Sequence, residues 1–140
     1  MRFWDSSALV ALIVRHERTA VLRRLHSRDA GVLAWILSDV EMRSAVARLG
    51  RDHSLDADGV QEAIARIEAF WQGVHTVSVI EPVKVRAKRL LGGHSLRAAD
   101  ALQLGAALTA AYDEPLGWEF VCLDERLGAA ARREGFSVLP

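Results

Sequence analysis

The sequence predicts an α/β protein with one domain, residues 1–140, in which helices flank both faces of a central, mainly parallel sheet. Apolar runs of strand length alternate with segments of helical spacing along the whole chain. The run VLAWIL at 32–37 is apolar throughout, which is typical of a parallel strand covered on both faces. Because no repeat, low-complexity tract or Pro/Ser-rich linker interrupts the 140 residues, we expect no second domain.

Five strands and seven helices are expected. The strands are expected at 2–4, 32–37, 74–80, 118–123 and 136–140. The helices are expected at 7–15, 17–28, 38–51, 55–73, 81–93, 96–112 and 124–135.

In the first half of the chain, local signals define most of these boundaries. RFW at 2–4 is a short apolar strand, and Ser6 or Ser7 is a suitable residue for the start of the helix that follows. Apolar residues at helical spacing predict the helix at 17–28. Ser38 with Glu41 three residues later has the pattern of a capping box and predicts the next helix start. Gly73 ends the following helix.

In the second half, prolines and glycines provide the signals. Pro82 suits the first turn of a helix, and Gly92-Gly93 interrupts it. LRAADALQLGAALTAAY at 96–112 then reads as a long, nearly all-apolar helix, which we expect to be buried. Gly135 ends the helix at 124–135.

Composition narrows the class of protein. The chain is 51% hydrophobic, and its 18 basic and 18 acidic residues give no net charge, so overall charge does not indicate a nucleic-acid binder. The apolar stretches are too short for a membrane span, and we expect no secretory signal, because no basic segment followed by an apolar run stands at residues 1–30. The single Cys122, within the run FVCL, is interpreted as a core thiol. We therefore expect a cytoplasmic protein that does not bind membranes.

Four carboxylates follow strands or begin helices, where α/β proteins bind ligands. They are Asp5 after 2–4, Glu41 after 32–37, Asp100 after Gly92-Gly93, and Asp124 after 118–123. Helix capping is an alternative explanation for Asp5, Glu41 and Asp124. Asp100, the only charge between Ala98 and Tyr112, is either paired with an arginine such as Arg97 or functional, because an unpaired buried carboxylate is costly.

If all four acids meet in one pocket, their mutual repulsion requires relief from arginines, raised pKa values or a divalent metal ion. Oxygen ligands favour Mg²⁺ or Mn²⁺, and ions held by shared carboxylates serve displacement at phosphorus. Other chemistries lack their motifs. The sequence contains no HExxH, CxxC, GxGxxG, GxxxxGK[ST] or GxSxG, and its five histidines are scattered.

With these acids in view, the sequence resembles the PIN-domain ribonucleases, and most closely the VapC toxins of bacterial toxin–antitoxin pairs. The resemblance covers essentially the whole chain and is carried by FWDSSALVALI, SDVEMRSAVARL, LRAADALQLGAAL and FVCLDERLGAAARREGFSVL. Gln103 and Gly105 depart from it, since many relatives have His and Ala at these positions. We expect neither to touch the acids, so these departures bear on details of substrate handling rather than on the class of enzyme.

The resemblance implies a Mg²⁺- or Mn²⁺-dependent endoribonuclease that cleaves tRNA or rRNA and leaves 5′-phosphate and 3′-hydroxyl ends. Asp5 and Asp100 would be the main metal ligands, with Glu41 and Asp124 completing the acidic pocket around a metal-activated water. Ser7 would orient Asp5 or the water. Arg126 would steady the pocket or contact phosphate, or it forms only a surface salt bridge.

The resemblance also implies a homodimer and a cognate VapB-type antitoxin whose C-terminal segment blocks the site. Apolar surface on the helices within 8–28 and 56–72 suits such contacts, although core packing explains the same pattern. RNA would be guided by basic residues of two segments. They are Arg15, Arg18, Arg23 and Arg24 in the first and Lys84, Arg86, Lys88, Arg89 and Arg97 in the second.

Two alternatives remain open at this point. One is a catalytically silent PIN-like module that binds a protein partner or RNA. The other is a non-toxin nuclease or phosphodiesterase on a similar fold, such as a metal-dependent DNase or phosphatase.

Overall fold

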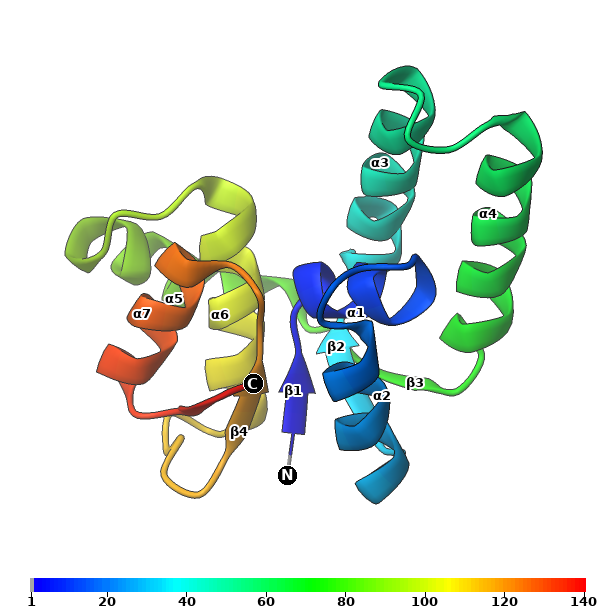
Figure 1. Cartoon of the computed structure of the whole chain (residues 1–140). Helices are drawn as coiled ribbons and strands as arrows, with labels where there is room; N and C mark the ends of the chain where they lie inside the picture. The colour runs from blue at the N-terminus through cyan, green and yellow to red at the C-terminus, as the bar shows by residue number, and fades with distance from the viewer. Residues whose placement is uncertain (1) are drawn as a thin grey trace.

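The computed structural model describes residues 2–140 and confirms the predicted α/β fold (Figure 1). The predicted domain also includes Met1, which lies outside the described residues. The strands are β1 (Arg2–Trp4), β2 (Val32–Trp35), β3 (Val74–Val77), β4 (Glu119–Val121) and β5 (Ser137–Leu139). The helices are α1 (Ser6–Ile13), α2 (Thr19–Arg28), α3 (Ser38–Arg51), α4 (Ala57–Trp71), α5 (Ile80–Gly93), α6 (Ala98–Ala110) and α7 (Glu125–Glu134).

The five strands form one sheet in the order β3-β2-β1-β4-β5, and every neighbouring pair is parallel. Because the chain adds strands outward on one side of β1 and then resumes on its other side at β4, the strand order reverses between these two strands. Such a reversal leaves a crevice at the carboxyl ends of the two strands, which is where open α/β sheets bind ligands.

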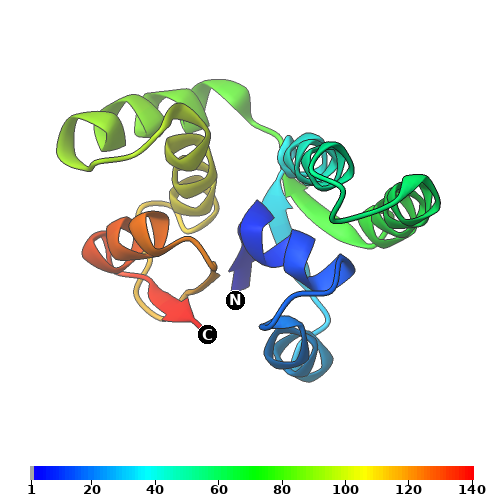
Figure 2. The same cartoon turned by 45° about the horizontal axis from the view of Figure 1, so that its top comes forward.

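Side-chain alternation along β1 divides the core into two layers. Phe3 belongs to the layer between the sheet and α5, α6 and α7, where its ring stacks on Phe120 with centroids 5.5 Å apart. Trp4 points to the opposite face and packs with Val121 and with α1–α4. Figure 2 shows the two groups of helices on either side of the central strands. Both faces of the sheet are therefore covered, as the apolar strands predict.

The antiparallel pair α3 and α4 extends past the carboxyl end of the sheet, above α1 in Figure 1. Met42 and Val46 of α3 and Ile67 of α4 are buried in the same layer as Trp4. The N-terminal part of α3 and the C-terminal part of α4 thus stay close to the sheet, while the far end of the helix pair extends beyond it.

Four of the five predicted strands are shorter in the structure. Strands β4 and β5 span 119–121 and 137–139 where 118–123 and 136–140 were predicted. Strand β2 ends at Trp35, and the predicted strand residues Ile36 and Leu37 form a turn before α3. Strand β3 ends at Val77, and α5 already begins at Ile80, so that Pro82 lies in its first turn as expected. Apolar residues at these strand ends belong to the connections, which period alone does not separate from a strand.

Within residues 2–140, no helix combines the length and the apolarity that a membrane crossing requires.

Candidate active site

The candidate site lies where the strand order reverses. Asp5 directly follows β1, and its backbone N–H donates to Val121 O of β4 at 2.9 Å, which continues the pairing of the two strands. Asp124 follows β4 after two further residues. The carboxyl ends of these two parallel strands therefore bring two of the predicted acids to one edge of the sheet.

Asp5 both caps a helix and lies almost fully buried, with 2% of its surface exposed. Its Oδ2 accepts hydrogen bonds from Ser7 N at 3.0 Å and Ser7 Oγ at 2.5 Å. Helix α1 begins at Ser6, one of the two serines expected at its start, and of the candidate capping residues Asp5 is the N-cap. Burial raises the pKa of Asp5 to about 6, against the lowering effect of the Ser7 hydrogen bonds.

Ser7 links Asp5 to the loop that follows β4. Its Oγ donates to Asp5 and accepts a hydrogen bond from Leu123 N at 3.0 Å. Cys122 is buried, as predicted for a core thiol, and burial raises its pKa. Its Sγ also lies 3.6 Å from Asp5 Oδ2 and 3.4 Å from Asp124 O. The serine and the cysteine thus pack the two acids against a common loop.

Glu41 lies in the first turn of α3 but does not cap it. The predicted capping box is wrong, because Leu37 is the N-cap residue and makes no side-chain cap hydrogen bond. The Glu41 carboxylate accepts instead from Ser6 Oγ and from Gln103 Nε2, each at 2.9 Å. Burial raises the pKa of Glu41, and the nearby Asp100 carboxylate raises it further.

Asp100 lies in the first turn of α6 and is half-buried. Its Oδ2 accepts from the backbone N–H of Arg97 at 3.3 Å, but the two residues form no ion pair within 4 Å. Burial raises the pKa of Asp100, and the Asp124 carboxylate adds to this, while Arg97 and Arg126 act in the opposite direction. The alternative of a buried Asp100–Arg97 ion pair is therefore not what the structure shows.

Asp124 is the exposed N-cap residue of α7, and its Oδ1 accepts from Leu127 N at 2.7 Å. It borders three cavities. One of about 560 Å³ also contains Arg97, Asp100 and Arg126, and one of about 670 Å³ includes Ser7. The third, of about 570 Å³, runs along the face of α7 that carries Gly128 and Arg132. Neither Asp5 nor Glu41 borders these three cavities.

The four acids form a row in space in the order Asp5, Glu41, Asp100 and Asp124. The charge of Glu41 raises the pKa of Asp5, that of Asp100 raises the pKa of Glu41, and that of Asp124 raises the pKa of Asp100. None of them forms an ion pair with a cation within residues 2–140. As their side chains lie, however, no three His, Cys, Asp or Glu residues of that range are close enough to hold one metal ion. The structure therefore shows a connected row of carboxylates rather than the single tight pocket expected.

Gln103 is the site residue that the sequence did not reveal. It was expected to lie apart from the acids, but its Nε2 donates to Glu41 Oε1 and to Ser38 Oγ, each at 2.9 Å. The sequence offered one weak signal, because a polar amide stands within a helix that is otherwise apolar on nearly every face.

Comparison with known proteins gives two similar curated sequences. The chain is 30% identical over 138 residues to Ribonuclease VapC45 of Mycobacterium tuberculosis strain CDC 1551 / Oshkosh. It is equally similar to Ribonuclease VapC49 of Mycobacterium tuberculosis strain ATCC 25618 / H37Rv. Each match covers 99% of this chain and 94% of the relative. No protein-family model matches the chain.

Solved structures confirm the fold. The crystal structure of FitAcB from Neisseria gonorrhoeae superposes with a TM-score of 0.64 at 18% identity, over 100% of this chain and 97% of the other. FitAB bound to an IR36 DNA fragment gives a TM-score of 0.64 at 17% identity, over 99% and 94% of the two chains.

Proposed function

Because the chain belongs to the VapC family of PIN-domain ribonucleases, we propose that it is the toxin of a type II toxin–antitoxin pair. In this proposal it is a Mg²⁺- or Mn²⁺-dependent endoribonuclease that cleaves tRNA or rRNA. The observation that carries the proposal is the row of four carboxylates, without ion pairs, at the strand reversal. Asp5 and Asp124 also cap helices, but capping does not require four carboxylates to gather at one edge without ion pairs, and such a row suits a cation.

The donor chemistry fits a hard divalent ion. Although no three potential ligands within residues 2–140 lie close together, proteins usually hold Mg²⁺ through one or two carboxylates, and water completes its coordination. All four predicted ligands, Asp5, Glu41, Asp100 and Asp124, offer carboxylate oxygens, which Mg²⁺ and Mn²⁺ prefer. The raised pKa values of Asp5, Glu41 and Asp100 show that burial and mutual repulsion disfavour their ionised forms. A divalent ion would relieve that repulsion, and when bound it would activate a water molecule for attack on phosphorus.

The chain's own residues hold the acids ready for this role. Ser7 keeps the Asp5 carboxylate directed beside the loop after β4, because its hydroxyl bridges Asp5 Oδ2 and Leu123 N. Glu41 is held through both of its oxygens, by Ser6 and by Gln103. Asp100 and Asp124 each accept a hydrogen bond from a backbone N–H at a helix start, which fixes the orientation of both carboxylates.

RNA is proposed to approach over arginines that border the cavities around Asp124. No ion pair within residues 2–140 involves these arginines. They are Arg15, Arg18, Arg48, Arg97, Arg126 and Arg132. By contrast, three members of the expected second basic segment are already paired, namely Lys84 with Glu81, Arg86 with Asp113 and Arg89 with Glu134. The proposed RNA path therefore leaves out these three residues of α5, because cations that are already paired have less charge to offer a phosphate.

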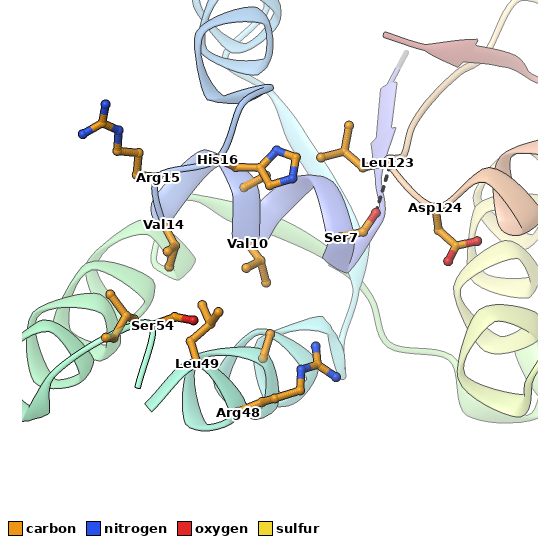
Figure 3. Close-up of a pocket in the computed structure, with 13 residues that line it drawn as sticks. Ser7, Val10, Val14, Arg15, His16, Arg48, Leu49, Ser54, Leu123 and Asp124 are labelled. Atoms are coloured by element: carbon orange, nitrogen blue, oxygen red, sulfur yellow. Dashed lines mark hydrogen bonds between the residues drawn. The ribbon is translucent and has the colours of Figure 1, made fainter. Parts of the chain in front are cut away.

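A cognate VapB-type antitoxin is the proposed protein partner. The cavity of about 670 Å³ is an apolar groove between α1 and α3 that ends at the candidate site. Figure 3 shows Val10 and Val14 facing Leu49 across it, with Ser7 and Asp124 at one end. An apolar segment of the antitoxin lying in this groove would reach the acids and block them. The walls come from α1 and α3, so α4 contributes less than the sequence suggested.

A homodimer is also proposed. Four large apolar side chains, Leu37, Val40, Val79 and Ile80, are 45–59% exposed at the carboxyl ends of the neighbouring strands β2 and β3. Exposed apolar groups that gather in this way are typical of protein interfaces. Sedimentation of Val40→Asp beside the wild type tests the proposal, since loss of dimer in the variant supports it and an unchanged mass contradicts it.

The activity itself is tested with protein purified free of any partner. RNA, single-stranded DNA and a small phosphodiester are incubated in parallel with Mg²⁺, Mn²⁺ or EDTA. The proposal predicts metal-dependent internal cleavage of RNA alone, with 5′-phosphate ends. Cleavage of DNA or of the small ester in preference to RNA would indicate the alternative nuclease or phosphatase. RNA binding without cleavage under every condition would indicate a silent binding module.

A further inference from the structure

Gln103 is a buried amide that connects the two helices carrying Glu41 and Asp100. Only 1% of its surface is exposed, and it lies one turn after Asp100 on α6. Both hydrogens of Nε2 are used, one on Glu41 Oε1 and one on Ser38 Oγ of α3, at 2.9 Å each. One side chain therefore joins α6 to the first turn of α3.

The spacing of these residues makes the connection specific to the acids. Asp100 and Gln103 are three residues apart on α6, and Ser38 and Glu41 are three apart on α3. Residues three apart share a helix face, so each acid lies beside one end of the Gln103 contact. The separation between the two carboxylates is therefore set in part by the length of the glutamine side chain.

The cost of burying this amide suggests a purpose beyond packing. Gln103 Oε1 is buried and has no hydrogen-bond partner within residues 2–140. An unsatisfied buried polar atom lowers the free energy of unfolding, a cost that leucine or methionine in the same space would avoid. An amide at this position is therefore less stabilising than an apolar side chain would be, but it provides the hydrogen bond to Glu41.

Glu41 has no freedom to turn while these contacts hold. Ser6 Oγ of α1 donates to Oε2, and Gln103 Nε2 of α6 donates to Oε1, so two different helices hold the two oxygens.

We propose that Gln103 is a positioning residue, which holds the Glu41 carboxylate in the orientation and at the separation from Asp100 that divalent-ion binding needs. The inference rests on the proposed metal-dependent activity. It concerns neither RNA binding nor the reacting atoms, because Gln103 acts through Glu41.

The test measures Mn²⁺ binding by electron paramagnetic resonance of the free ion, so it does not depend on cleavage. Gln103→Leu removes both hydrogen bonds, and Gln103→Met is the second variant if the first fails to fold. Partners that orient metal ligands are worth 10- to 100-fold in metal affinity, so we expect the Kd for Mn²⁺ to rise by about that factor. Gln61→Leu, on the exposed surface of α4, is the matched control and should bind as the wild type does.

A double-mutant cycle separates positioning from a general structural role. If Gln103 acts through Glu41, adding Gln103→Leu to Glu41→Gln causes little further loss of Mn²⁺ affinity. Wild-type affinity in Gln103→Leu, or additive losses in the double variant, overturns this inference while leaving the proposed function intact. Absence of Mn²⁺ binding by the wild-type protein overturns both.

Discussion

Asp5 shows how one residue serves folding and function in opposite ways. Its carboxylate caps α1 and organises Ser7, yet its burial places a charge in the core at neutral pH. Because the Asp5 carboxylate is buried and forms no ion pair within residues 2–140, its ionised form lowers the free energy of unfolding. A site that tolerates this cost is consistent with selection for ion binding.

The pH dependence of stability tests this reading of Asp5. Its pKa is about 6 in the folded protein against an ordinary 3.8, so the folded state holds the proton more tightly and stability falls as pH rises between these values. In EDTA at pH 7.5, the free energy of unfolding of Asp5→Asn, measured by urea denaturation, should therefore exceed that of the wild type by up to about 3 kcal/mol. The difference should shrink toward zero near pH 4.

The control for this experiment is Asp29→Asn, at an exposed position, which should change stability by less than about 0.5 kcal/mol at each pH. An Asp5→Asn protein that is no more stable than the wild type at pH 7.5 contradicts the reading.

At the residue scale, the four acids were predictable because each follows a strand or opens a helix, and parallel strands deliver such positions to one edge. Their hydrogen-bond partners were not. Ser38 and Glu41 fit a local capping box, but the structure turns both toward Gln103, 62 or more positions away in sequence. Local pattern cannot show a competing tertiary contact of this kind, and so the role of Gln103 was missed.

At the element scale, the backbones of α5 and α6 approach each other closely at Gly105. A Cβ on Gly105 would lie 3.0 Å from Val83 O and 3.2 Å from Ala87 N, both backbone atoms of α5. Glycine at 105 therefore lets α6 approach α5 closely, and α6 carries both Asp100 and Gln103. The position of the candidate site depends on this packing.

Gly105→Ala should destabilise the protein by roughly 1–3 kcal/mol, because backbone atoms cannot yield as a side chain can. Thermal and urea unfolding measure the effect. Gly92→Ala in the last turn of α5 is the matched control, since a Cβ there meets nothing within 4 Å. It should be neutral or stabilising by up to about 1 kcal/mol. Equal stability of the two variants would show that the α5–α6 approach is not tight.

The two faces of α7 give a second prediction at this scale. Asp124, Gly128 and Arg132 recur every four residues and border the same cavity, whereas the exposed Arg133 does not. If RNA crosses this face, Arg132→Gln should reduce the slope of log K against log salt by about 0.7, the value for one single-strand phosphate contact.

Binding is measured in an Asp100→Asn background to prevent cleavage, with Arg133→Gln as the control on the same helical turn. An Arg132→Gln slope that equals the Arg133→Gln slope would remove this face from the RNA path.

The sequence predicted all five strands and all seven helices, because Gly, Pro and apolar periodicity mark them. Boundaries were less accurate where apolar residues continue into a connection, as at Ile36 and Leu37. The sequence left the capping residue of α1 open and misassigned that of α3 for a different reason: several polar side chains compete at each helix start, and tertiary contacts decide among them.

At the scale of the whole molecule, the strand order is what creates the site. Alternating strands and helices predict a parallel sheet, but they do not determine that β1 lies between β2 and β4. That arrangement places Asp5 and Asp124 on adjacent strand ends, while α3 and α6, one on each face, supply Glu41 and Asp100. The proximity of the four acids therefore depends on the assembled fold, because they come from four segments that are distant in sequence.

The central claim is that these distant carboxylates act together on a divalent ion that cuts RNA. The most direct test follows cleavage of a defined RNA by wild-type, Asp5→Asn and Asp100→Asn proteins across a Mn²⁺ titration, with folding verified by circular dichroism. Loss of several kcal/mol of transition-state stabilisation corresponds to at least a hundredfold slower cleavage in each variant. Wild-type rates in either correctly folded variant, or undiminished wild-type cleavage in EDTA, would contradict the account.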